Sequence, residues 1–215
     1  MLRKVFWEDP YLTHLDTEIA TVDGQDVTLA ATVIYAFSGG QESDAGFIGG
    51  QPVLVAKKVG ADIVYTLPAG HGLAVGDRVA TEIDWERRYR LMRLHFAAEI
   101  VLEIVYRDLG PIEKIGAHIA ADKARIDFAR AFPVTAELPA LLAHASAIID
   151  ADLPITRAFS DEATGRRFWQ VTGFNSVPCG GTHLRRTGEV GAIALKRRNI
   201  GKDKERIEIM LDGHS

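Results

Sequence analysis

Cys179 and His183 are separated by the three residues Gly-Gly-Thr, and Cys179 is the only cysteine of this 215-residue chain. Zn²⁺ favours thiolate and imidazole ligands in a tetrahedral shell. A short turn rich in glycine lets a cysteine and a histidine converge on one ion. The spacing therefore predicts half of a zinc site.

A second pair of donors is expected from His95 and Glu99, which stand four residues apart in a segment with helical periodicity. Side chains at this spacing leave the same face of a helix, one turn apart. Joined with Cys179 and His183, they predict a zinc site with four donors. Taken singly, each part has a simpler interpretation, because a lone cysteine is often a small buried hydrophobe and a His-Glu pair is often the polar edge of a helix.

The chain resembles the free-standing alanyl-tRNA editing proteins, which are similar to the editing domains of alanyl- and threonyl-tRNA synthetases. The resemblance covers nearly the whole chain. Its motifs are Phe6-Trp7-Glu8-Asp9-Pro10-Tyr11, Gly39-Gly40-Gln41 with Ser43-Asp44, Ile83-Asp84-Trp85-Glu86-Arg87-Arg88-Tyr89, Met92-Arg93-Leu94-His95, Arg125-Ile126-Asp127-Phe128, Cys179-Gly180-Gly181-Thr182-His183, Thr187-Gly188-Glu189-Val190-Gly191 and Asn199-Ile200-Gly201-Lys202.

The resemblance implies an aminoacyl-tRNA deacylase that removes serine or glycine from tRNA for alanine. It implies that His95, Glu99, Cys179 and His183 hold zinc and that Glu99 and Gln41 act in catalysis. The substrate-binding residues that it implies are Gly39, Gly40, Gln41, Phe96 and Thr182. The chemical logic is proofreading, because a synthetase pocket separates amino acids that differ by a methylene by only ~1 to 3 kcal/mol.

Three departures from the family pattern lie at this site. The family usually has His-Thr-x-x-His where this chain has His95, Phe96 and Glu99, and Ser38 and Glu42 replace a glycine and a proline around the Gly-Gly-Gln motif. Phe96 is expected to narrow or dry the pocket and so to change which amino acid is accepted. Glu99 has two possible roles, since a carboxylate can be the fourth zinc ligand or the general base for a water.

Composition predicts a soluble, globular protein of the reducing cytoplasm. Hydrophobic residues make up 47% of the chain and charged residues 25%. No apolar run approaches the roughly 20 residues that a membrane span needs, and one cysteine excludes an internal disulfide.

The net charge of −4 argues weakly against a nucleic-acid partner, but the charge is uneven. Residues 185 to 206 hold eight basic and three acidic residues, next to the Cys-Gly-Gly-Thr-His motif. Local basic patches are sufficient for phosphate binding, although a solvated charged face has the same composition. The predicted contacts to the tRNA acceptor end are Arg185, Arg186, Arg197, Arg198 and Lys202.

Periodicity predicts an α+β protein of two domains that divide near residue 83. Alternating segments in residues 16 to 35 and 51 to 83 predict a small β-barrel-like domain, 1–83, which carries the Gly-Gly-Gln motif. In residues 84–215, Asp84 is expected to cap a helix that ends at Gly110, and a second helix is expected after Thr135. Strands are expected at 117–120, 124–128, 168–173, 191–196 and 206–211, giving an editing domain with helices on a mainly antiparallel sheet.

Two further hypotheses compete with the deacylase. The first is a zinc-stabilised paralogue that binds tRNA or a protein without hydrolysing an ester, which the altered helix motif favours. The second is a metal-dependent hydrolase of small esters, for which no motif names a substrate.

Overall fold

The computed structural model describes residues 2–212, which form two compact units. The first unit holds the chain up to Ser38 together with Glu42–Tyr89, and the second holds Gly39–Gln41 together with the chain from Arg90 onward. The division falls inside the longest helix, and the Gly-Gly-Gln loop groups with the second unit. No helix within residues 2–212 is long and apolar enough to cross a membrane.

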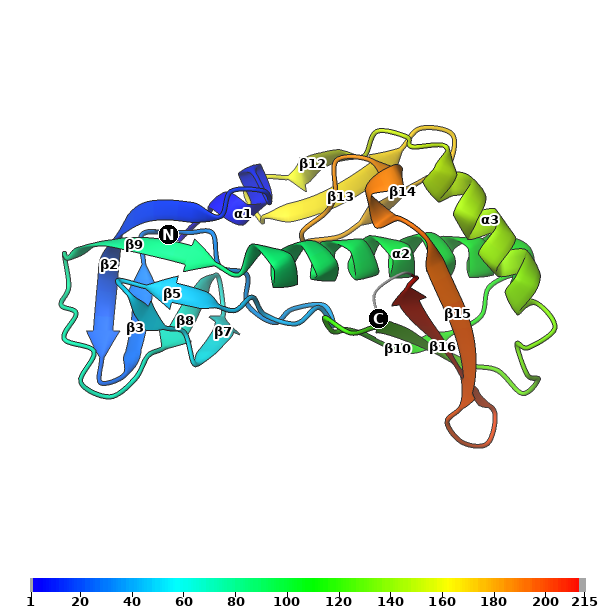
Figure 1. Cartoon of the computed structure of the whole chain (residues 1–215), viewed down its shortest axis with the longest axis horizontal. Helices are drawn as coiled ribbons and strands as arrows, with labels where there is room; N and C mark the ends of the chain where they lie inside the picture. Colours follow the sequence, from blue (N-terminus) through cyan, green and yellow to red (C-terminus); the bar gives the residue numbers. More distant parts are fainter. Residues whose placement is uncertain (1, 213–215) are drawn as a thin grey trace. The chain divides into compact units, whose positions relative to one another are not determined.

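Antiparallel strands make up most of the first unit (Figure 1). Seven of them form one sheet in the order β6-β5-β9-β2-β3-β8-β7. Their bounds are β2 (His14–Asp23), β3 (Asp26–Leu29), β5 (Gly46–Ile48), β6 (Gln51–Pro52), β7 (Val55–Val59), β8 (Asp62–Thr66) and β9 (Arg78–Ile83). Two short strands, β1 (Arg3–Lys4) and β4 (Ala31–Thr32), pair in parallel, and helix α1 (Val5–Glu8) follows β1.

Strand β2 bends this sheet into a half-barrel. Its first half, from His14 to Glu18, pairs with β9, and its second half pairs with β3. The register shifts between Ile19 and Thr21, and such bulges increase the local twist of a strand. The buried side chains inside the bend are mostly β-branched, aromatic or leucine, which suit a pleated surface: Ile19, Val27, Leu29, Val33, Ile34, Ile48, Ile63, Tyr65, Leu67 and Val79.

A buried ion pair fixes the loop after the Gly-Gly-Gln motif to the first turn of the next helix within the first unit. Arg88 has no exposed side-chain surface, and its Nε donates to Oδ1 of Asp44 at 2.8 Å. Its other nitrogens donate to the carbonyls of Pro10 at 2.9 Å and Val33 at 2.6 Å. Asp44 also accepts the backbone N–H of Tyr35 at 2.6 Å, so both charged groups are hydrogen-bonded as burial requires.

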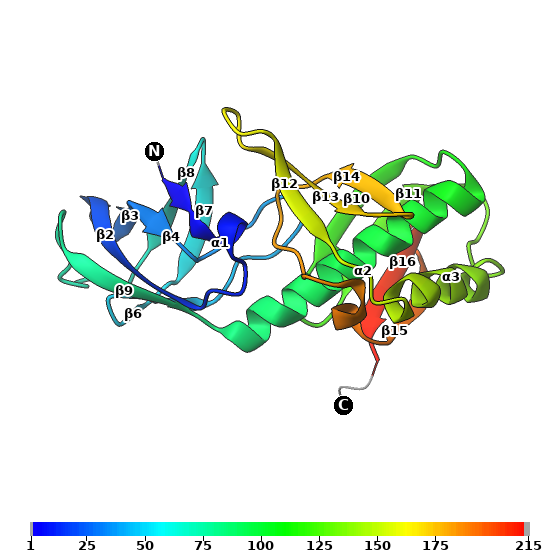
Figure 2. The same ribbon diagram turned by 90° about the horizontal axis from the view of Figure 1, so that it is seen from above.

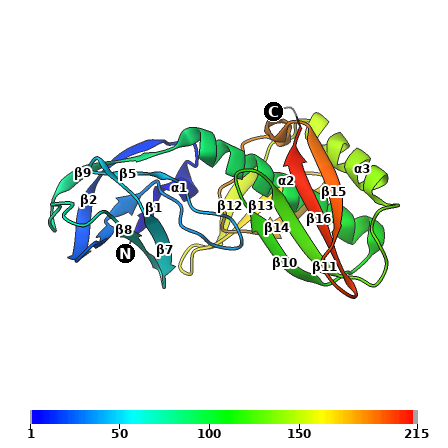
Figure 3. The same cartoon turned by 60° about the horizontal axis from the view of Figure 1, so that its bottom comes forward.

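The second unit consists of two antiparallel sheets and two long helices. One sheet has the order β10-β11-β16-β15, with β16 between β11 and β15 (Figure 3), and the other has the order β12-β13-β14. The strands are β10 (Lys114–Ile119), β11 (Ala124–Ala129), β12 (Thr156–Asp161), β13 (Arg166–Val171), β14 (Asn175–Pro178), β15 (Ile193–Asn199) and β16 (Lys204–Leu211). The helices are α2 (Trp85–Leu109), α3 (Leu138–Asp150) and the short 3₁₀ helix η1 (Thr187–Val190).

Helix α2 begins and ends as the sequence predicts. Oδ1 of Asp84 accepts the backbone N–H of Arg87 at 3.0 Å, which is the hydrogen bond of an N-cap. After Leu109, Gly110 adopts a φ of 82°, a conformation that commonly terminates helices. In the second unit α2 runs between the two sheets (Figure 1), and its side chains from Leu91 to Val105 are buried on most sides. That placement explains why its apolar residues do not form a narrow stripe.

The expected strands are present, but they belong to two sheets rather than one. The segments expected at 168–173 and 191–196 correspond to β13 and β15, which lie in different sheets. Strands β12 and β14 were not expected from the sequence. Both pair with β13, so the three-stranded sheet depends on a register that single segments do not reveal.

Candidate metal centre

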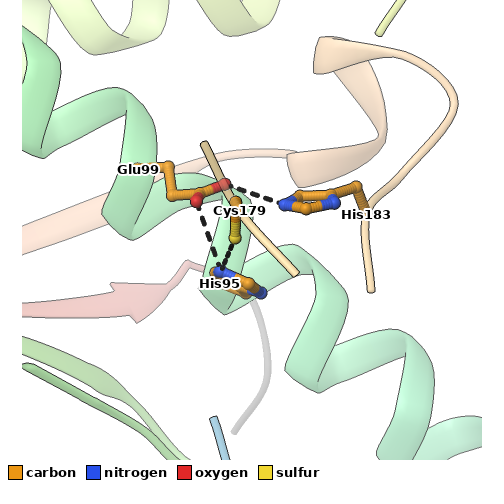
Figure 4. A group of neighbouring side chains, drawn as sticks. All are labelled: His95, Glu99, Cys179 and His183. Atoms are coloured by element: carbon orange, nitrogen blue, oxygen red, sulfur yellow. Dashed lines mark hydrogen bonds and ion pairs between the residues drawn. The ribbon is translucent and has the colours of Figure 1, made fainter. Parts of the chain in front are cut away.

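Four side chains of the second unit converge at one point (Figure 4). Each offers a ligand atom, and these atoms all lie within 4.8 Å of one another. His95 and Glu99 come from the middle of α2, and Cys179 and His183 both lie in the loop that follows β14. The four residues that the sequence spacing predicts are therefore brought together.

The separations fit a small tetrahedral cation. Nε2 of His95 lies 3.4 Å from Oε1 of Glu99 and 3.5 Å from Sγ of Cys179, and Nε2 of His183 lies 3.1 Å from Oε2 of Glu99. The ligand atoms of a tetrahedral zinc site lie roughly 3.3 to 3.8 Å apart. The arrangement is thus close to the shell that such a metal ion requires.

Gly181 makes this convergence possible. A Cβ atom at Gly181 would lie 2.1 Å from Cε1 of His95 and 3.0 Å from Oε1 of Gln41. No side chain fits in that space, so the loop can pass the His95 ring only with glycine at this position. The neighbouring Gly180 has nothing within 4 Å of the same added atom. Gly181 is therefore required for steric reasons, whereas the space around Gly180 would accept a Cβ atom.

The four side chains shift one another's pKa values. Burial would lower the pKa of His95, but Glu99 and Cys179 raise it well above its ordinary value, and the pKa of His183 is raised for the same reasons. Burial would raise the pKa of Glu99, but the two imidazoles hold it well below its ordinary value. The pKa of Cys179 is lowered, since the imidazoles outweigh burial and Glu99. These shifts favour an ionised thiolate and carboxylate beside protonated imidazoles, and a metal ion that binds here would displace the imidazole protons.

His95 uses one ring nitrogen within the cluster. Its Nε2 faces Glu99 and Cys179, whereas its buried Nδ1 has no hydrogen-bond partner among the described residues. In metal sites the second nitrogen of a ligating histidine usually donates to a carboxylate, a carbonyl or a water.

The Gly39–Gln41 loop lies against the Cys-Gly-Gly-Thr-His loop, within the same unit. Nε2 of Gln41 donates to the hydroxyl of Thr182 at 2.9 Å, and the backbone N–H of Thr182 lies 3.5 Å from Oε1 of Gln41. Gly40 has a φ of 88°, and a Cβ there would lie 2.7 Å from the carbonyl oxygen of Ala117. At Gly40 the space for a side chain is therefore taken by the backbone of strand β10, and both polar groups of Gln41 face Thr182.

Phe96 is fully buried beside the cluster. Its ring packs edge-on against Trp169 with centroids 5.1 Å apart, and lies 6.1 Å from the ring of His183. An aromatic ring at this position fills apolar space next to His183, one of the four candidate metal ligands.

The basic residues expected to bind tRNA have acidic neighbours in several cases. Arg197 makes two bonds of 2.6 Å to Glu205, Arg198 contacts Glu208 at 3.2 Å, and Arg186 contacts Asp152 at 2.7 Å. Arg185 and Lys202 are exposed. The cluster that is basic in sequence is therefore partly neutralised, across β15 and β16 for Arg197 and Arg198 and by Asp152 after α3 for Arg186.

Two arginines that no sequence motif singled out lie beside the Cys179–His183 loop. Nη1 of Arg157 donates to the carbonyl of His183 at 3.1 Å, and the carbonyl of Arg167 accepts the backbone N–H of Cys179 at 2.9 Å. Strand β12 was not expected, so the sequence offered no register that would place these two side chains together. The turn-forming run between Asp161 and Gly165 is the signal that would have predicted the hairpin.

Comparison with known proteins gives a consistent set of relatives. The family described as the threonyl and alanyl tRNA synthetase second additional domain matches residues 167–208. The chain is 30% identical to the alanyl-tRNA editing protein AlaX-M of Pyrococcus horikoshii over 99% of both chains. It is 30% identical to AlaX-M of Methanosarcina mazei over 98% of this chain and 97% of that protein. Similarity to the alanine–tRNA ligase of Pyrobaculum aerophilum, at 31%, covers 91% of this chain and 25% of the ligase.

Proposed function

The chain belongs to the alanyl-tRNA editing protein family, and from that membership we propose that it hydrolyses the ester bond of mischarged tRNA in trans. Hydrolysis adds water across the ester and releases the amino acid and a tRNA with a free terminal hydroxyl. The observation that carries the proposal is the cluster of four metal-binding side chains beside the Gly39–Gln41 loop. The expected partner is tRNA for alanine, and the expected location is the cytoplasm, where charged tRNA is used.

Zinc is the proposed cofactor. The support is the donor set, because one thiolate, two imidazoles and one carboxylate match the ligands that zinc takes in proteins. A bound Zn²⁺ supplies positive charge that stabilises negative charge developing on the ester during hydrolysis. We assign Glu99 to the ligand set because its two oxygens contact the imidazoles of His95 and His183. In this assignment Glu99 contributes to catalysis by holding the zinc ion and not by contacting the substrate.

The chain's own polar groups orient the aminoacyl end. Gln41 and Thr182 are both buried and hydrogen-bonded to each other, so their remaining donor and acceptor capacity is held in fixed directions. Gly39 has open space around it for backbone approach to the ester, whereas Gly40 lies against the backbone of β10. We propose that these residues contact the substrate and that Phe96 sets the size of the amino acid accepted.

Serine and glycine are the proposed amino acids that are removed. Phe96 is larger than the threonine usual in the family, and its buried ring packs against Trp169 and lies beside His183. We propose that residues 1–83 form a β-rich domain and that residues 84–215 form the editing domain. The support for the second part is that every proposed metal ligand follows residue 84.

The decisive experiment compares the hydrolysis of seryl-, glycyl- and alanyl-tRNA for alanine by the purified protein, with and without a zinc chelator. We expect rapid, chelator-sensitive loss of the serine or glycine ester and slow loss of the alanine ester. A protein that retains zinc and binds tRNA, but hydrolyses none of the three esters, would reject the deacylase. That result would support the rival hypothesis of a binding paralogue, which the Glu99 and Phe96 departures favour.

The same assay distinguishes the two possible roles of Glu99, as a zinc ligand or as a general base. Glu99→Ala is expected to lose both zinc and activity. A variant that keeps stoichiometric zinc and loses only the rate would instead identify Glu99 as a general base.

A further inference from the structure

The four-stranded sheet of the second unit packs against α2 with one face only. In Figure 3 its strands lie in front of α2, and Figure 2, seen from the other side of the unit, shows β12 and β13 in front of that helix. Successive residues of a strand point to opposite faces of a sheet. Ile126, Ile207 and Ile209 are buried on the face toward α2, so the residues between them lie on the outer face.

Two rows of charged side chains cross this outer face. Residues that pair across antiparallel strands share a face of the sheet. From β11 through β16 to β15, the rows are Arg125–Glu208–Lys196 and Asp127–Arg206–Arg198. Lys123, in the turn before β11, adds a base whose Nζ lies 2.8 Å from Glu208. We call these seven side chains the basic sheet face.

The acids of the basic sheet face lie beneath its bases. Each acid is bonded to two bases, and the bonded groups are Asp127 with Arg125 and Arg206, and Glu208 with Lys123 and Arg198. The two carboxylate side chains are 10% and 6% exposed, whereas the four bases are between 24% and 55% exposed. The acids therefore hold the bases in place, and the outermost groups are cations. Each guanidinium has five N–H donors, so bonds to one carboxylate leave donors for a second anion.

The basic sheet face has more positive than negative charge. Five of its seven side chains are basic and two are acidic, which leaves an excess of three positive charges. Lys196 is exposed and pairs with no carboxylate among the described residues. The whole chain has a net charge of −4, so this excess is local. A local excess of this kind attracts a polyanion.

The side chains of this face suit phosphates better than unpaired bases. Besides charged residues, the outward positions of β11, β15 and β16 hold only Ala129, Ala194 and Met210. Proteins bind single-stranded RNA mainly by stacking its bases on aromatic rings, whereas paired RNA is bound through its backbone. A basic face without aromatic rings is therefore matched to a double helix.

The same sheet adjoins the candidate metal centre through its edge strand β10. The backbone N–H of Ile119 donates to the carbonyl of Gly40 at 2.8 Å, and Gln41 donates to Thr182 at 2.9 Å. The sheet is therefore joined by hydrogen bonds to the loops beside the four candidate ligands.

We propose that the basic sheet face binds the phosphates of base-paired RNA, namely the acceptor stem of the tRNA whose ester is hydrolysed. The identity of the RNA rests on the proposed function, and its paired form rests on the sheet. The interface includes Arg198 and excludes its neighbour Arg197, whose side chain turns to the opposite face and bonds Glu205 at 2.6 Å.

The test measures binding of a fluorescent RNA hairpin with a fully paired stem to the full-length protein over a range of salt concentrations. Lys196→Gln and Arg198→Gln are each expected to weaken binding about fivefold. Each should lower the slope of log affinity against log salt by about 0.9, and the double variant by about 1.8, as for phosphate contacts with a double helix. Hairpins of different sequence should be weakened equally, since phosphate contacts carry no sequence information.

Arg166→Gln is the matched control, because it removes one positive charge from an exposed position of the other sheet of the same unit. It is expected to keep the wild-type affinity and slope, and Lys196→Arg, which keeps the charge, should do the same. Zinc content and thermal melting are measured for every variant. Lys196→Gln is expected to leave both unchanged, since it breaks no ion pair among the described residues.

The outcomes separate this inference from the proposed function. A wild-type protein that binds the hairpin through Lys196 and Arg198, yet hydrolyses no ester, would support the inference and reject the deacylase. A salt slope for the double variant that matches that of Arg166→Gln would overturn the inference even in an active enzyme. A single-stranded RNA of equal length that binds as tightly as the hairpin, and is weakened as much by the double variant, would also overturn it.

Discussion

At the scale of single residues, Gly181 is the position on which the metal cluster depends most directly. We expect Gly181→Ala to lose bound metal and, with it, activity, because the added methyl would lie 2.1 Å from the His95 ring and the loop or the helix would have to move. Metal content after gel filtration, measured by elemental analysis, checks this. Gly180→Ala is the control, as open space surrounds that position, and equal metal content in the two variants would contradict the prediction.

The sequence was informative about residues that act through local spacing. The pairs His95–Glu99 and Cys179–His183 each span four residues, so a helix turn and a short loop were enough to place the two members of each pair together. Joining the two pairs into one site rested on the family resemblance. Contacts that join distant segments were not predictable in this way. Gln41 and Thr182 are 141 residues apart, and their hydrogen bond depends on the packing of two loops. Arg157 and Arg167 became neighbours only through the register of β12 and β13.

At the scale of elements, the first turn of α2 is attached to the loop after Gln41 by the buried Arg88–Asp44 pair. Asp44→Ala is expected to reduce the free energy of unfolding by about 3 to 5 kcal/mol, because it leaves the guanidinium of Arg88 buried without its counter-charge. Chemical denaturation monitored by tryptophan fluorescence measures this loss. Glu42→Gln breaks the more exposed pair with Arg87 and should cost less than about 1 kcal/mol. Similar losses in the two variants would contradict the interpretation.

Strand β11 carries the clearest acid-sensitive contact of the four-stranded sheet. Burial would raise the pKa of Asp127, but bonds from Arg206 at 2.7 and 3.0 Å, together with Arg125, hold it below its ordinary value. The ionised carboxylate therefore stabilises the fold above a pH of about 4, and this contribution is lost as the pH falls through the lowered pKa.

Asp127→Asn is accordingly expected to be less stable than the wild type by about 1 kcal/mol at pH 7 and nearly equal to it at the lowest pH where both remain folded. Thermal melting across this pH range measures the difference. Asp122→Asn, which removes a carboxylate from an exposed position in the turn between β10 and β11, serves as the control. A difference that stays constant with pH would show that Asp127 stabilises the sheet by packing rather than by charge.

At the scale of the whole molecule, all four candidate ligands belong to the second unit, and the first unit has its own buried core. A ligand that binds only the folded state stabilises it by about 2.7 kcal/mol at a concentration of 100 times its dissociation constant. Removing the proposed zinc should therefore loosen the second unit selectively. We expect a chelator to accelerate hydrogen exchange in the middle of α2 and in the Cys179–His183 loop, with little change in β2 and β3. Cys179→Ser should show fast exchange in these segments with or without chelator. Equal acceleration in both units would instead mean that the chain unfolds as a single cooperative body.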